Sequence, residues 1–205
     1  MSRDTSSIFI PLLENGNGNV KANFMYSFLE SIASRPFHVI HIADSLVSRA
    51  RNVAAAAFLK TEYEFLLFWD ADIIATDQHL TWLGEHDDEI LCGIYPKKCK
   101  ELIPVLNTLP GTESIETGGL IEIARGGTGF MRIHRSVFEA MKKVCPEYDN
   151  HGELQWDFFQ VGVRKREYCS EDWSLCDIAR SLGFKIMLDS RIQLRHEGSA
   201  IYPLL

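Results

Sequence analysis

The stretch Phe65–Ile74, FLLFWDADII, joins a run of large apolar residues to two aspartates, Asp70 and Asp72, before apolar residues resume. A short segment that is apolar on both faces and bounded by polar residues is typical of a strand buried in a parallel sheet. In such sheets, ligands bind beyond the carboxyl ends of the strands. The two carboxylates therefore indicate a ligand-binding edge rather than a core position.

The residues before this stretch have the same organisation. Residues 7–13 and 37–43 are predicted strands, and residues 20–35 and 44–60 carry the apolar spacing of amphipathic helices. The order strand, helix, strand, helix, strand predicts an α/β fold with a mainly parallel central sheet flanked by helices.

The second half of the chain gives a less regular pattern. Residues 100–119 are rich in Pro, Gly and Thr and are predicted to form a loop, while KIMLD (185–189) and IQLRH (192–196) are predicted as separate late strands. No linker divides the 205 residues, so we expect a single domain over residues 1–205.

Composition excludes several classes of protein. The chain is 46% hydrophobic and 24% charged, as in a globular protein, and its formal charge of −7 argues against a nucleic-acid partner. No apolar run approaches the roughly 20 residues of a membrane span. The N-terminus lacks signal-peptide features, and five cysteines is an odd count that favours a reducing compartment, so we expect a cytoplasmic location.

Asp70-Ala71-Asp72 is the first candidate site. In an extended backbone the two carboxylates lie on the same side, where hard oxygen ligands suit Mn²⁺ or Mg²⁺ completed by water and substrate phosphate. His196, at the end of a late strand, could supply a third ligand. The alternatives are solvated turn acids and a histidine at the surface or the edge of the core.

Asp44, Arg49 and Asn52 form a second candidate group at the second predicted helix. Arg49 and Asn52 are one helical turn apart and share a face, so Arg49 could hold a phosphate or a nucleotide edge. Asp44 could accept a hydrogen bond from a base. The alternatives are a helix N-cap for Asp44 and a solvated cation for Arg49.

Glu171 and Asp172 open a further predicted helix. They could act as a catalytic base or bind a sugar hydroxyl, although acids are favoured in a first helical turn in any case. The glycines at positions 126, 127 and 129 permit close approach of the backbone to a ligand, and a bulge or sharp bend is the alternative.

Together these motifs resemble the GT-A class of nucleotide-sugar glycosyltransferases. The matching segments occur in family order over roughly residues 8–198: SRARN, FLLFWDAD, CGIYPKK, GGTGFMRIHRSVFE, SEDWSLCDIARSLGFKIMLD and LRHEG. Within this class the chain looks most like a viral enzyme implicated in capsid-protein glycosylation, which would place it in the host cytoplasm.

The resemblance implies a Rossmann-like GT-A fold with a nucleotide-donor half over about residues 1–100 and an acceptor half over about residues 101–205. It implies transfer of a hexose from a UDP-sugar such as UDP-glucose to a glycan or glycoprotein acceptor, with Mn²⁺ or Mg²⁺ as cofactor. The implied metal ligands are Asp72 and His196, with Asp70 shared between metal and donor. Asp172, or Glu171 beside it, would serve as base. The implied nucleotide- and donor-binding residues are Leu12, Asp44, Arg49, Asn52, Asp70, Ala71, Asp72, Lys97, Gly127 and Ser199.

Two other functions stay open at this stage. A nucleotidyltransferase that forms a nucleotide sugar would use the same fold type and metal acids, but it usually has a Gly-rich basic signature after the first strand, and ENGNGNVK is a poor version of one. The third possibility is a non-catalytic module that binds a nucleotide sugar, because fold resemblance alone does not fix function.

Overall fold

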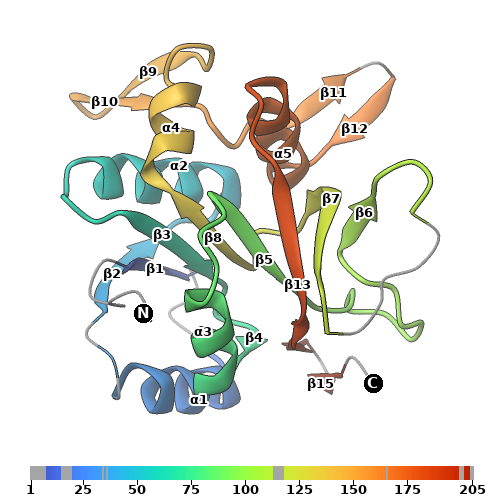
Figure 1. Cartoon of the computed structure of the whole chain (residues 1–205). Coiled ribbons are helices and arrows are strands. Elements are labelled where there is room, and N and C mark those ends of the chain that lie inside the picture. The colour runs from blue at the N-terminus through green and yellow to red at the C-terminus, as the bar shows by residue number, and fades with distance from the viewer. Residues whose placement is uncertain are drawn as a thin grey trace.

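The computed structural model describes residues 8–14, 20–33, 35, 37–112, 118–164, 166–198 and 201–203. Its centre is an eight-stranded sheet with the order β2-β1-β3-β8-β5-β13-β7-β6 (Figure 1). These strands are β1 (Ile8–Glu14), β2 (His38–Ala43), β3 (Phe65–Trp69), β5 (Ile90–Ile94), β6 (Leu106–Thr108), β7 (Leu120–Gly126), β8 (Phe130–His134) and β13 (Ile186–Gln193).

The sheet is mixed in direction. β1 pairs in parallel with β2 and β3, and β13 pairs in parallel with β5. β8 lies antiparallel between β3 and β5, and β7 lies antiparallel between β13 and β6. The carboxyl ends of β3 and β5 therefore reach the same edge, where the loop that precedes β8 lies between them.

Helices cover both faces of the sheet, which confirms the predicted α/β layers (Figure 1). β3 shows the reason, because Leu66 and Phe68 pack in one hydrophobic cluster while Leu67 and Trp69 pack in the other. Alternate side chains of a strand point to opposite faces, so a strand with helices on both sides is apolar throughout. The helices are α1 (Ala22–Ala33), α2 (Val47–Leu59), α3 (Asp77–Gly84), α4 (Arg135–Met141) and α5 (Glu171–Ser181).

Three smaller sheets surround this core. β9 (Glu147–Asn150) and β10 (Glu153–Trp156) form one hairpin, and β11 (Gly162–Arg164) and β12 (Glu167–Cys169) form another just before α5. The third sheet has the order β15-β14-β4, with β4 (Ile73–Ile74), β14 (Arg195–Glu197) and β15 (Ile201–Tyr202). It brings the end of the described chain against the segment that follows Asp72.

Two local predictions were wrong. The predicted loop over residues 100–119 contains β6, because residues 106–108 find a partner in β7. The predicted strand over residues 192–196 is not a single element, since β13 continues to Gln193 and His196 lies in the separate strand β14.

Two buried or partly buried arginines close helix ends. Arg135 donates to the backbone carbonyls of residues 58, 59, 61 and 63 at the end of α2. Arg132 donates to Leu83 O at 2.5 Å at the end of α3. The last carbonyls of a helix lack intrahelical donors and carry partial negative charge, so guanidinium groups stabilise both ends.

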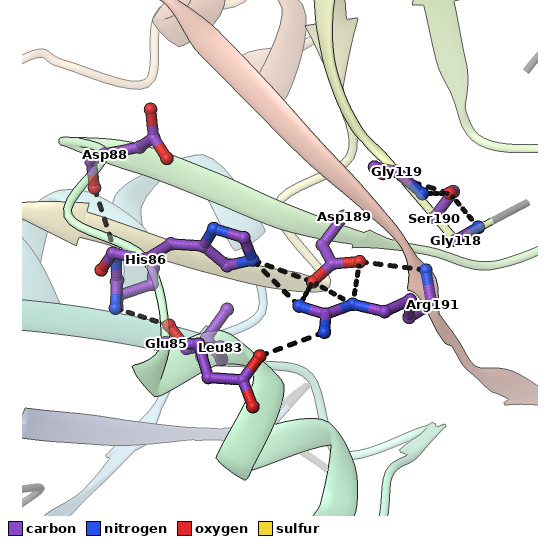
Figure 2. A network of polar contacts seen from close by, with 10 residues as sticks. Leu83, Glu85, His86, Asp88, Gly118, Gly119, Asp189, Ser190 and Arg191 are labelled. Carbon is purple, nitrogen blue, oxygen red and sulfur yellow. Dashed lines mark hydrogen bonds and ion pairs between the residues drawn. The ribbon is translucent and has the colours of Figure 1, made fainter. Parts of the chain in front are cut away.

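A polar network joins α3 to β13 (Figure 2). Asp189 is fully buried and accepts from Arg191 Nη2 at 2.6 Å, with His86 Nε2 at 2.8 Å from the same carboxylate. Burial alone would raise the pKa of Asp189, but the hydrogen bonds from Arg191 and His86 hold it below its usual range. The hydroxyl of Ser190 accepts from the N–H groups of Gly118 and Gly119. This network fixes the segment where β13 loses its regular register with β5.

Candidate functional site

Asp70-Ala71-Asp72 forms a turn at the carboxyl end of β3. The Asp70 N–H donates to Gly129 O, and the Ile73 N–H returns to Asp70 O, both at 2.9 Å. The expectation of an extended segment with both carboxylates on one side is therefore wrong, because the chain bends back into β4 at this point. The two side chains have different partners: Asp70 contacts α2, and Asp72 contacts β14 and the segment after β5.

Asp72 and His196 are brought together by the pairing of β4 with β14, in which His196 lies opposite Ile73. The Asp72 Oδ1 atom is 3.6 Å from His196 Nε2, and its Oδ2 atom is 2.5 Å from Lys98 Nζ. Burial raises the pKa of Asp72, but the interactions with His196 and Lys98 outweigh it, so the pKa is lowered. The Asp72 carboxylate is thus held ionised at the sheet edge.

His196 is oriented through its other ring nitrogen. Nδ1 lies 2.9 Å from Pro96 O, and a carbonyl can only accept, so Nδ1 carries a proton. In the neutral imidazole the lone pair is then on Nε2, facing the Asp72 carboxylate. A histidine whose far nitrogen donates to a backbone carbonyl is the usual arrangement of a metal ligand.

Arg51 links Asp70 to α5. Its side chain is 4% exposed, and Nη2 donates to Asp70 Oδ2 at 2.8 Å, while Nε is 3.8 Å from Glu171 Oε1. The guanidinium lies over the Phe68 ring. Burial disfavours its charge, but Asp70 and Glu171 outweigh this and raise the pKa of Arg51. Within the described part of the chain, Arg51 Nε and Nη1 and Asp70 Oδ1 have no hydrogen-bond partner, so this buried group retains unused donors and an unused acceptor.

Glu171 and Asp172 open α5 as predicted, with Ser170 at the N-cap. Burial raises the pKa of Glu171 despite the neighbouring Arg51. Asp172 Oδ1 accepts from its neighbour's N–H, Trp173 N, at 2.8 Å, and also from the Ser170 hydroxyl. The two acids therefore differ: Glu171 is charged at a free-energy cost, and Asp172 is fixed in orientation by hydrogen bonds.

The side chain of Tyr95 fills the space beside Gly127 and Gly129. The Gly129 N–H donates to the Tyr95 hydroxyl at 2.9 Å, and a Cβ on Gly127 would lie only 2.2 Å from that oxygen. Residues 127 and 129 must therefore be glycine for Tyr95 to fit, so the close approach foreseen from the sequence is to a side chain of the protein. Tyr95 also packs edge-on against His196, and its burial raises the pKa of the phenol well above the usual value. It stands between the Asp70 and Asp72 groups as a neutral spacer.

The second candidate group forms a separate cluster. Arg49 Nε and Nη2 donate to both oxygens of Asp44 at 2.6 and 2.8 Å, and Asp44 Oδ1 also accepts from the Leu46 N–H. Asn52 is buried; it donates to Asp157 and accepts from the Phe159 N–H. Asn52 therefore connects α2 to the loop that follows β10. It lies on the same helix as Arg49, but the two side chains have different hydrogen-bond partners.

The remaining predicted donor residues are dispersed. Leu12 and Ala71 pack partly buried beside the cluster that contains Trp69. Lys97 is exposed, and its backbone N–H donates to Ile103 O at 2.7 Å. Ser199 lies outside the described residues.

A divalent cation fits part of this arrangement. Among the described residues, no group of three or more His, Cys, Asp or Glu side chains is close enough to hold a metal ion. Asp72 and His196 nevertheless present a carboxylate oxygen and an oriented imidazole nitrogen 3.6 Å apart. Mg²⁺ and similar ions need only one or two protein ligands when substrate phosphates supply the rest. Asp70 faces Arg51 in this structure, so its carboxylate is not part of that pair.

Sequence reasoning missed three residues of the site: Arg51, Tyr95 and Lys98. Helical phase gave a signal for Arg51, because it precedes the buried Ala55 by four residues and Phe58 by seven. Lys98 carried no such signal, since nothing in YPKK separates it from Lys97. To predict the position of Tyr95, one would have to infer that a bulky residue at the end of β5 packs against the glycines that precede β8.

Comparisons with known proteins support the fold. No protein-family model and no curated protein matches the chain. Among solved structures, A197 from STIV is similar with a TM-score of 0.61 at 16% identity, over 93% of this chain and 85% of that one. The inositol-1-phosphate CTP transferase from T. maritima is similar with a TM-score of 0.51 at 9% identity, over 92% of this chain and 86% of that one.

In the described segments no helix is long and apolar enough to cross a membrane. The chain has an α/β fold with a large mixed sheet, consistent with a Rossmann-like GT-A fold and similar to the folds of these two solved structures.

Proposed function

We propose that this protein is a metal-dependent glycosyltransferase that moves a hexose from a UDP-sugar, such as UDP-glucose, to a hydroxyl of a glycan or glycoprotein. The observation that carries the proposal is the pairing of Asp72 with a histidine whose Nδ1–H is fixed by Pro96 O. That pairing joins the predicted D-x-D motif to the late histidine across 124 positions of sequence, as the resemblance to GT-A enzymes requires.

Each residue group has a task in this proposal. Asp72 and His196 hold Mn²⁺ or Mg²⁺, which when bound supplies positive charge for the leaving diphosphate. Arg51 holds the carboxylate of Asp70, whose side chain is 27% exposed, and we assign Asp70 to accept from a hydroxyl of the donor. Asp44 and Arg49, further along the same edge, contact the nucleotide.

The acceptor hydroxyl must lose a proton as it attacks the sugar carbon. Asp172 is our choice for the base, because Ser170 and Trp173 hold one of its oxygens in place and fix the direction of the carboxylate. Glu171 adjoins Arg51 and is placed to contact the donor sugar or to share this task. In a retaining enzyme the acids would position the sugar instead.

A nucleotidyltransferase is the second candidate, because one similar structure is a CTP transferase. It would use the same carboxylates to bind metal and triphosphate. The two functions differ in their products: a glycosyltransferase releases UDP from UDP-glucose, and a nucleotidyltransferase releases pyrophosphate from a nucleoside triphosphate and a sugar phosphate.

Calorimetric titration tests the site first. UDP, GDP and CMP are titrated in Mn²⁺ and again in excess EDTA. We expect UDP alone to bind tightly, and only with metal, and we expect Asp72→Ala to abolish that binding while the fold remains intact by circular dichroism. Binding that ignores EDTA, or unchanged affinity in the variant, would remove Asp72 from the metal site.

The activity is then assigned by product. UDP release from UDP-glucose in Mn²⁺, stimulated by a glycan acceptor, supports the transferase. Pyrophosphate release from UTP or CTP with a sugar phosphate would replace it with the nucleotidyltransferase. Tight UDP-glucose binding without slow hydrolysis or transfer would indicate a non-catalytic binding module.

A further inference from the structure

Lys98 forms the shortest ion pair of the candidate site. Its Nζ atom lies 2.5 Å from Asp72 Oδ2, and the two side chains are 39% and 31% exposed. The ammonium therefore lies against the same carboxylate that faces His196 with its other oxygen. At this position the positive charge of Lys98 would compete with a divalent cation for the Asp72 carboxylate.

The loop that carries Lys98 is anchored at its base. Pro96 and Pro104 pair as an isolated antiparallel β-bridge. Beside it, the Val105 N–H donates to Tyr95 O at 2.9 Å and the Lys97 N–H donates to Ile103 O. The Pro96 carbonyl also accepts from His196 Nδ1. One loop thus orients the histidine and delivers the lysine, while the partly exposed Lys98 side chain keeps the rotational freedom of four methylene groups.

The charges of Asp72 and Lys98 determine how the site responds to a divalent cation. A carboxylate oxygen that accepts from an ammonium is a weaker ligand for a cation, and the two positive charges repel each other at this range. A diphosphate carried with the metal offers the ammonium several new oxygens. Lysine, a compact point charge with three donors, suits phosphate.

We propose that Lys98 neutralises Asp72 while the metal is absent and binds the diphosphate once metal and nucleotide are present. This inference rests on the proposed function and adds a residue and a binding order to it. Metal alone must displace the ammonium, whereas metal with diphosphate gives the ammonium a new partner. Mn²⁺ and UDP therefore bind cooperatively, each raising the affinity of the other by the same factor.

The test measures Mn²⁺ binding through the electron paramagnetic resonance signal of the free ion, with and without saturating UDP. It compares the unmodified protein, Lys98→Gln and the matched control Lys100→Gln, which removes another exposed lysine charge of the same loop. Lys98→Met repeats the charge removal with a different side chain, and circular dichroism checks the fold of each variant.

Without UDP, Lys98→Gln and Lys98→Met should bind Mn²⁺ about two- to fivefold more tightly than the unmodified protein, the range that a partly exposed ion pair supplies. The factor by which UDP raises Mn²⁺ affinity should fall by about tenfold, because the variants gain metal affinity and also lose a diphosphate contact of similar size. Lys100→Gln should change neither quantity by more than about twofold.

The outcomes separate the two proposals. If Mn²⁺ and UDP bind the unmodified protein but both Lys98 variants match Lys100→Gln, Lys98 has no such role and the proposed function stands. If UDP binds without Mn²⁺, or neither binds, the metal-dependent site itself is wrong and the role of Lys98 is overturned with it.

Discussion

Replacing Arg51 with methionine tests whether the buried arginine of α2 stabilises the fold more than its exposed neighbour Arg49 does. Arg51 is 4% exposed, and its partner Asp70 is 27% exposed at an Nη2–Oδ2 distance of 2.8 Å. Removing one member of a buried ion pair costs about 3–5 kcal/mol because the other charge is left without compensation. Water reaches part of Asp70, so we expect a smaller loss than this, about 2–3 kcal/mol of unfolding free energy.

Arg49→Met is the matched control, two positions away on the same helix. The Arg49 side chain is 51% exposed, against 12% for Asp44, so the pair lies at the surface with its cation in contact with water. Such pairs contribute little to stability, so this variant should lose clearly less unfolding free energy than Arg51→Met despite its two short hydrogen bonds.

Urea unfolding followed by circular dichroism and by tryptophan fluorescence measures both variants. Equal slopes against urea concentration would license comparison of the free energies. The double variant Arg51→Met/Asp70→Asn should recover part of the loss, since it removes the uncompensated charge. An Arg51→Met variant no less stable than Arg49→Met would refute the view that Arg51 and Asp70 form a buried, mutually dependent pair.

Three further predictions concern the acids and the thiols. Asp172→Asn should leave metal-dependent UDP binding intact and slow transfer by about 10²–10⁴-fold, the usual contribution of a general base; full activity by UDP release would end its assignment as base. Glu171→Gln should unfold at a higher urea concentration at neutral pH, because burial raises the pKa of Glu171 and penalises its ionised form. A raised carboxyl pKa makes folding less favourable as the pH rises through it, so this advantage should vanish in acid below the unfolded pKa of about 4.3; an advantage that persists there would point to packing instead. Burial raises the pKa of Cys145 to about 11 and of Cys176 to about 12, whereas Cys99 is only partly buried. A thiol reagent should therefore label Cys99 first under native conditions, and Cys99→Ser should remove the fast phase of labelling.

The sequence predicted those parts of the fold that depend on local patterns. Alternation of apolar strands and amphipathic helices is written in neighbouring residues, so β1 to α2, and the strand before Asp70, lie where they were expected. The turn at Asp70-Ala71-Asp72 was not foreseen, because it depends on β4 pairing with β14, more than a hundred residues away. A pattern confined to one segment carries no information about such a partner.

In the candidate site, too, local sequence patterns select some residues and miss others. Residue type and position at a strand end were enough to select Asp72 and His196, which the structure brings together. Helical phase distinguishes Arg51 from Arg49, but it does not show that Arg51 meets Asp70 and Glu171. Likewise, nothing local shows that Lys98 rather than Lys97 meets Asp72, because the partner lies on another element. Residues selected through the resemblance alone, such as Leu12 and Ala71, lie in the structure without a contact that tests their role.

The insertion of β8 between β3 and β5 also has a consequence for how the chain folds. β8 comes from residues 130–134, yet it pairs with strands from residues 65–69 and 90–94, and β13 from residues 186–193 pairs with the other side of β5. Contacts between segments so distant in sequence make folding slow, because each closes a long loop before it gains stability. During synthesis, residues 1–100 would have to wait for the rest of the chain, with the apolar edges of β3 and β5 unpaired and open to aggregation. Residues 1–100 are therefore not an autonomous folding unit, and their separate expression should yield insoluble protein.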